Sequence, residues 1–60
     1  MVIYKHYKKK ESRYIIVDMC LLQDHFGEWQ NAVIYKELSS NLKFCRFESE
    51  FEDKFLAEEK

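Results

Sequence analysis

The side chains best suited to metal binding or nucleophilic chemistry are two histidines and two cysteines, each isolated along the chain: His6, Cys20, His25 and Cys45. A structural zinc site needs ligand pairs at short spacing, such as C-x-x-C or H-x-x-x-H. A cysteine nucleophile needs a base within hydrogen-bond reach. No such pair occurs here, and no base stands beside either thiol in the sequence. We therefore predict no metal site, no cofactor and no enzymatic activity.

A basic run near the start of the chain is the one feature with nucleic-acid chemistry. It comprises Lys5, Lys8, Lys9, Lys10 and Arg13, interleaved with tyrosines. Clustered cations neutralise phosphates, and tyrosine rings stack on exposed bases. The isoelectric point near 6.1 is low for a nucleic-acid binder. The simpler interpretation is a solvated turn whose lysines discourage pairing between sheet edges.

Large aromatic side chains around the only glycine indicate a protein-binding surface. Phe26 and Trp29 flank Gly27, where we expect a turn. Exposed tryptophans are typical of interface hot spots. The alternative is that Trp29 covers the open end of the protein's own core. The predicted surface combines this turn with one face of the neighbouring strands, and its residues are Tyr14, Ile16, Phe26, Trp29 and Tyr35.

Arg46 alternates with Leu42 and Phe44, which predicts that its guanidinium is partly buried. A buried guanidinium needs a polar partner. We expect a carboxylate of this chain, such as Asp18 or Glu37. The functional alternative is an arginine presented to an acidic partner.

The chain of 60 residues predicts one small domain, 1–60, of mainly β class. Its start is basic and its end is acidic, a difference that either steers partners or pairs the two ends within the fold. Two cysteines do not make a disulfide framework, and no apolar stretch has the length of a signal or a membrane span. We expect a cytoplasmic protein with no membrane partner.

Four segments alternate as strands, with turns between them: residues 2–7, 13–22, 29–38 and 42–47. Ile15, Val17, Met19 and Leu21 form an unbroken apolar set, so we predict that this face lies in the core. The opposite face is apolar enough that a second copy of the chain could cover it.

Residues 48–58 fit two structures. Phe47, Phe51 and Phe55 recur at spacing four after a capping-box pattern from Ser49 to Glu52, which favours a short helix. Alternation over the same residues favours a closing strand. The predicted fold is thus a small SH3-like barrel or a four- to five-stranded meander with a short C-terminal helix.

The motifs Tyr4-Lys5-His6-Tyr7-Lys8 and Val33-Ile34-Tyr35-Lys36-Glu37-Leu38, with Tyr14, Arg46 and Phe51, span nearly the whole chain. Their pattern resembles a family of short bacterial and phage proteins, the domain-of-unknown-function family 1653. Lys9 and Phe47 stand where that family usually has Gly and Pro. The resemblance implies a small SH3-like barrel and no particular activity.

These observations predict a non-catalytic protein-interaction module, in the style of a small phage or bacterial accessory factor that binds a host or bacterial protein. The alternative function is a nucleic-acid-binding small barrel that uses the basic turn. A homodimer is a further candidate.

Overall fold

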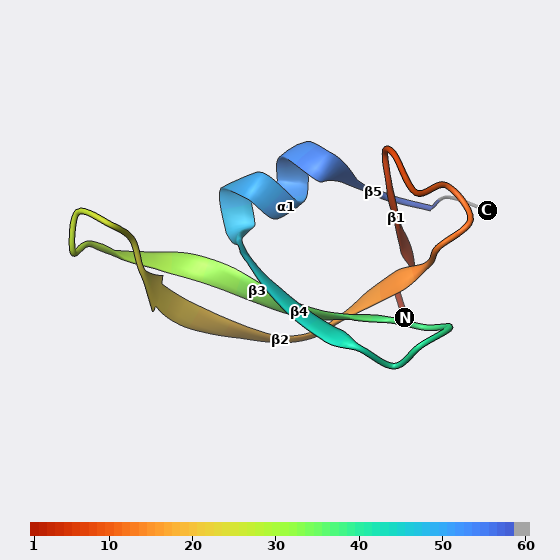
Figure 1. Ribbon diagram of the computed structural model, residues 1–60, viewed down its shortest axis with the longest axis horizontal. Helices are drawn as coiled ribbons and strands as arrows, with labels where there is room; N and C mark the ends of the chain where they lie inside the picture. Colours follow the sequence, from red (N-terminus) through yellow and green to blue (C-terminus); the bar gives the residue numbers. More distant parts are fainter. Residues whose placement is uncertain (59–60) are drawn as a thin grey trace.

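The computed structural model describes residues 1–58 and shows one antiparallel sheet of five strands with one short helix. The elements in chain order are β1 (Tyr4–His6), β2 (Tyr14–Gln23), β3 (Trp29–Glu37), β4 (Lys43–Phe47), α1 (Glu48–Lys54) and β5 (Phe55–Ala57). Strands β1 to β4 form a meander, and β5 returns to the other side of β1, so the order across the open sheet is β4-β3-β2-β1-β5 (Figure 1). The predicted mainly β fold, its meander and its short helix are confirmed.

Two residues with positive φ make the turns that the sequence predicted. Gly27 has φ 85° in the turn between β2 and β3, and Asn41 has φ 62° in the turn between β3 and β4. Asparagine tolerates this left-handed conformation better than most residues. The amide of Asn41 donates to the Glu37 carbonyl at 2.8 Å, which closes the second turn. Both turns therefore have a local cause in the sequence.

A bulge at Val17 overturns the predicted inward face of β2. The register runs from Ile16 opposite Tyr35 to Asp18 opposite Ile34, which leaves Val17 without a partner. An extra residue in one strand moves every later side chain to the other face. Met19 and Leu21 therefore share the face of Ile16, on the helix side of the sheet. The short helix leaves both side chains exposed, and Val17 is exposed as well, so the predicted core set is wrong.

The core lies between the sheet and the helix and is mostly aromatic. Helix α1 crosses one face of the sheet (Figure 1), and its Phe51 is 3% exposed. Tyr14 packs edge-on against Phe55 with ring centroids 5.1 Å apart, an arrangement that aromatic pairs favour. The cluster consists of Tyr14, Val33, Tyr35, Phe51 and Phe55, with Tyr4 against it.

Both structures predicted for the C-terminal segment occur, one after the other. The helix begins at Glu48 and ends at Lys54, and β5 then pairs with β1. The predicted capping box is wrong, because Phe47 occupies the N-cap and no side chain caps the helix. The basic and acidic ends of the chain do meet, since Arg13 forms an ion pair with Glu58.

Within residues 1–58, no helix has the length and apolar character that crossing a bilayer requires.

Candidate functional site

The β2–β3 hairpin extends beyond the body of the protein. Strand β4 pairs with β3 only as far as Ala32, so residues 21–31 are paired only with each other. We call residues 21–31 the arm; it forms the left part of Figure 1. The molecule is accordingly long, with extents of 38 × 20 × 19 Å. An arm that contacts little of its own chain presents both faces to solvent.

The tip of the arm is held by the Asp24 carboxylate. Its Oδ1 accepts hydrogen bonds from the amides of Phe26 at 2.9 Å and Glu28 at 3.0 Å, while Gln30 donates to Oδ2 at 3.3 Å. These bonds, led by the one from Glu28, lower the pKa of Asp24. The turn is therefore fixed by local hydrogen bonds, and it holds the ring of Phe26 out in solvent.

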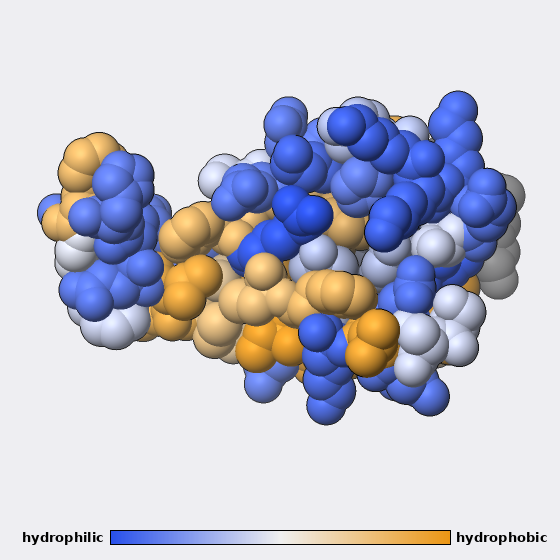
Figure 2. Space-filling view, viewed as in Figure 1, coloured by the Kyte–Doolittle hydropathy of each residue, from blue (hydrophilic) through white to orange (hydrophobic). Residues whose placement is uncertain are grey.

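One face of the sheet carries a row of exposed apolar side chains along the arm and its base. Trp29 is diagonal to Leu21 across the two strands, and Met19 and Ile16 continue the row toward the helix. We call Ile16, Met19, Leu21 and Trp29 the apolar strip. Trp29 is 62% exposed, and Phe26 at the tip is 79% exposed. Figure 2 shows hydrophobic atoms gathered along the neck between the tip and the body.

The structure divides the predicted protein-binding residues into two groups. Phe26, Trp29 and Ile16 are exposed, whereas Tyr14 is 5% and Tyr35 is 3% exposed. The rings of Tyr14 and Tyr35 belong to the core, so they offer no surface to a protein partner. Met19 and Leu21 were missed by the sequence analysis, because the bulge that turns them to this face has no clear sequence signal.

The basic turn keeps four of its five cations in solvent. Lys5, Lys8, Lys9 and Lys10 are exposed. Arg13 differs, because it pairs with Glu58 and donates from Nη1 to the Lys10 carbonyl and, at 3.2 Å, to that of Ser12. Arg13 therefore stabilises the turn and the closing strand, and the four lysines are the cations available to a phosphate backbone.

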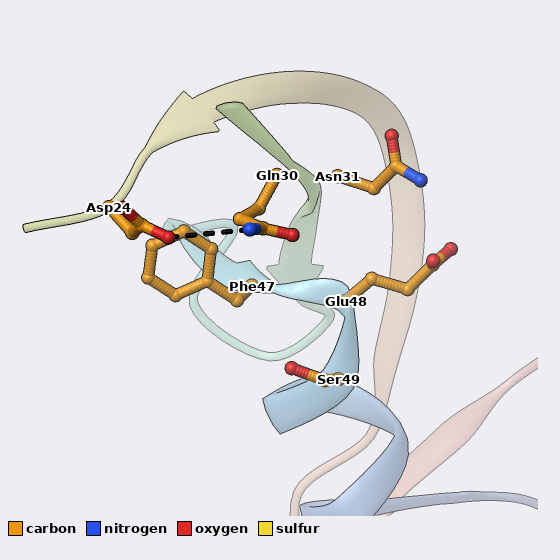
Figure 3. A pocket seen from close by; sticks show the side chains of 6 residues that line it. All are labelled: Asp24, Gln30, Asn31, Phe47, Glu48 and Ser49. Carbon is orange, nitrogen blue, oxygen red and sulfur yellow. Dashed lines mark hydrogen bonds between the residues drawn. The ribbon is translucent and has the colours of Figure 1, made fainter. Parts of the chain in front are cut away.

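An open cavity of about 330 Å³ lies between the arm and the start of α1 (Figure 3). Its lining residues are Asp24, Gln30, Asn31, Phe47, Glu48 and Ser49. The Asp24 carboxylate is already bound by the amides of Phe26 and Glu28 and by Gln30. Figure 3 shows the bond from Gln30. The cavity thus offers polar walls without a free, convergent group, which gives it no evident chemistry.

The two thiols lie on the sheet face opposite the helix. Cys20 pairs with Ala32 and Cys45 pairs with Ile34, so strand β3 runs between them. Partial desolvation raises the pKa of the Cys45 thiol, although the residue as a whole is exposed, and the neighbouring Cys20 thiol adds to this effect. A raised pKa lowers the thiolate fraction and hence nucleophilicity. Among the described residues, no three His, Cys, Asp or Glu side chains converge as metal ligands.

Arg46 has a different partner from the two that the sequence suggested. Its Nε donates to the Tyr35 hydroxyl at 2.7 Å, and its guanidinium lies 5.8 Å from the centre of the Phe55 ring. Asp18 is opposite Ile34, on the other face of the sheet. Glu37 instead accepts hydrogen bonds from the hydroxyls of Ser40 and Tyr14. The predicted carboxylate partner is therefore wrong.

Comparison of the chain with protein-family models, with curated proteins and with solved structures gives no match in any of the three.

Proposed function

We propose that this chain is a non-catalytic protein-interaction module that binds a protein partner through the apolar strip and Phe26. The observation that carries the proposal is the exposure of Trp29. A domain of 60 residues gains much from burying its only tryptophan, yet this one lies on the arm, away from the core. Contiguous exposed apolar side chains mark interaction sites, and tryptophan is enriched among binding hot spots.

The arm also has the construction of a contact surface. Its apolar side chains project from two paired strands, and its tip is fixed by the Asp24 hydrogen bonds. A surface that is ordered before binding loses less conformational freedom when the complex forms. The resemblance to family 1653 adds the suggestion of a small phage or bacterial accessory factor with an SH3-like fold, acting in the cytoplasm on a host or bacterial protein.

Affinity capture from cell lysate tests the proposal, with nuclease present and bound proteins read by mass spectrometry. We expect the tagged chain to retain a stoichiometric protein, and Trp29→Ala or Leu21→Ala to lose it. Leu42→Ala is the matched control, because Leu42 is 59% exposed but lies in the turn between β3 and β4. Equal capture by Trp29→Ala and by the control would remove the arm as the binding surface.

Nucleic-acid binding through the basic turn is the second candidate, and the exposure of Lys5, Lys8, Lys9 and Lys10 favours it. It predicts that binding to an oligonucleotide weakens steeply as salt rises. Replacing Lys8, Lys9 and Lys10 by Gln should flatten that dependence. An oligonucleotide affinity that does not change with salt concentration would contradict this candidate.

A second copy of the chain is the simplest partner for the apolar strip. Mass measurement over a range of concentrations distinguishes this case. A dimer that Trp29→Ala dissociates would make the apolar strip a self-association site. A monomer at all concentrations would indicate that the partner is a different protein.

A further inference from the structure

A small pocket of about 90 Å³ lies at the end of the molecule away from the arm tip. Strands β1, β2, β3, β4 and β5 and the basic turn all contribute to its wall, and the lining residues are His6, Lys9, Tyr14, Tyr35, Phe44, Arg46 and Phe55. This volume holds about three water molecules. It is well below the roughly 300 to 1,000 Å³ of pockets that enclose a drug-sized ligand. The pocket therefore fits one chemical group rather than a complete small molecule.

The polar atoms of this pocket are almost all hydrogen-bond donors. The Tyr35 hydroxyl accepts from Arg46 Nε at 2.7 Å, so its own proton is free to donate, as are the two Nη groups of the guanidinium. His6 Nδ1 accepts from the Lys8 amide at 3.0 Å, which places the proton of the neutral ring on Nε2. Lys9 adds an ammonium group.

No carboxylate of residues 1–58 forms an ion pair with Arg46, Lys9 or His6. Arg46 has no acidic partner within 4.0 Å in that range, where Arg13 and Glu58 form the ion pair. The pKa of His6 is lowered by burial, and then by the charges of Arg46, Lys54, Lys9 and Lys8. Every charge that acts on His6 is thus positive.

The pKa of Glu37 is lowered first by hydrogen bonds from Ser40 and Ser12, and the charge of Lys9 also contributes. This carboxylate therefore lies near Lys9, but its oxygens are already engaged. They accept from the Ser40 hydroxyl at 2.6 Å and from the Tyr14 hydroxyl at 3.5 Å. Tyr14 therefore turns its polar end toward Glu37 and contributes its ring to the pocket. The donors of Arg46, Lys9, His6 and Tyr35 are left to share a ligand from outside.

We infer that this pocket binds a single phosphoryl group, either as inorganic phosphate or as a phosphate monoester. A phosphate monoester carries a charge of about −1.5 to −2 at neutral pH and three terminal acceptor oxygens, which matches two permanent cations and several converging donors. A carboxylate offers only two oxygens and one charge, so it would leave donors unfilled. This inference does not depend on the arm.

Titration of the full, isotope-labelled chain followed by nuclear magnetic resonance tests the inference. The probes are sodium phosphate and phenyl phosphate, with sodium acetate and sodium chloride at matched ionic strength as controls. We expect saturable shifts of the Tyr35 and Arg46 amides with both phosphates, together with a rise in the pKa of His6. Tighter binding of phenyl phosphate would identify a monoester as the ligand, and tighter binding of sodium phosphate would identify free phosphate. Equal binding would support the inferred recognition of the phosphoryl group alone.

Variants locate the binding. We expect Arg46→Gln to weaken phosphate binding by about tenfold or more, because hydrogen bonds to charged groups are worth about 1.5 to 3 kcal/mol. Lys43→Gln removes an exposed cation from the same strand and should change binding by less than about twofold. Lys9→Gln, at an exposed position, should fold even if Arg46→Gln does not, and should also weaken binding. Shifts that acetate reproduces, or that both Arg46→Gln and Lys9→Gln retain, would overturn the assignment, as would no saturable shift in the intact chain.

Discussion

Phe51, in the last turn of the helix, stacks on Phe55, the first residue of β5, with ring centroids 4.4 Å apart and ring planes 7° from parallel. The pair joins the helix to the strand that follows it without a loop. Both rings also contact Tyr35 on the sheet. One stack therefore holds helix, closing strand and sheet together.

Replacing Phe51 by Ala should unfold much of the protein. A buried Phe→Ala change costs about 3 to 5 kcal/mol, which is comparable with the entire stability of a domain of 60 residues, about 3 to 9 kcal/mol. Urea unfolding followed by circular dichroism measures the loss. Leu56→Ala is the control, because Leu56 is exposed and should change stability by less than about 0.5 kcal/mol. Equal losses in the two variants would contradict the core assigned here.

The fluorescence of Trp29 should report solvent exposure and, later, binding. Trp29 is the only tryptophan, so the emission has a single source. We expect a long emission wavelength and efficient quenching by iodide in the free protein, and a blue shift with protection when a protein partner covers the arm. A quencher that fails to reach the ring in the free monomer would contradict the exposed arm.

The free energy of unfolding should decrease below about pH 6.5 because of His6. In the folded protein the pKa of His6 lies below its usual value of 6.5, so on acidification the unfolded chain takes up this proton first. The stabilisation is complete above pH 6.5 and is lost as the pH falls toward the lowered pKa. Urea midpoints at several pH values measure this slope, and His6→Gln should reduce it. Saturating phosphate should reduce it too, since the bound anion favours the protonated ring.

Cys20 and Cys45 should not form a disulfide with each other under mild oxidation. They lie on β2 and β4, two strand spacings apart, or roughly 9 to 10 Å. A disulfide needs Cα atoms within about 7 Å. Mass spectrometry after treatment with oxidised glutathione should therefore find no bond within one chain. Alkylation of Cys45 should be slow at neutral pH, because its pKa is raised. A rapidly formed internal disulfide would mean that the sheet opens between these strands.

Strands and turns were predictable because their signals are local. Alternation located the four meander strands to within about two residues at each end, and Gly27 located the hairpin turn. The C-terminal segment carried two periodicities because it contains two elements. Spacing four brings Phe51 and Phe55 together, and alternation fits the pairing of residues 55–57 with β1.

The candidate surfaces were only partly predictable, because they depend on register between distant strands. The bulge at Val17 decides which face of the sheet Met19 and Leu21 occupy, and valine has no special tendency to bulge. Arg46 is opposite Val33 and therefore diagonal to Tyr35. The polar partner of Arg46 is the Tyr35 hydroxyl, whereas the sequence predicted a carboxylate. The presence of an acidic residue in the sequence does not show whether its side chain lies on the same face of the sheet as the arginine.

The pairing of Tyr4 with Ala57 has a kinetic consequence. Each of the three hairpins can form between neighbouring segments, but the sheet is finished only when two segments from opposite ends of the described chain meet. Contacts of such sequence separation slow folding, because loop closure precedes the gain from pairing. In a nascent chain, the aromatic cluster would remain incomplete until residues 55–57 leave the ribosome. During that interval the edge of β1 would be unpaired and could pair with a strand of another chain.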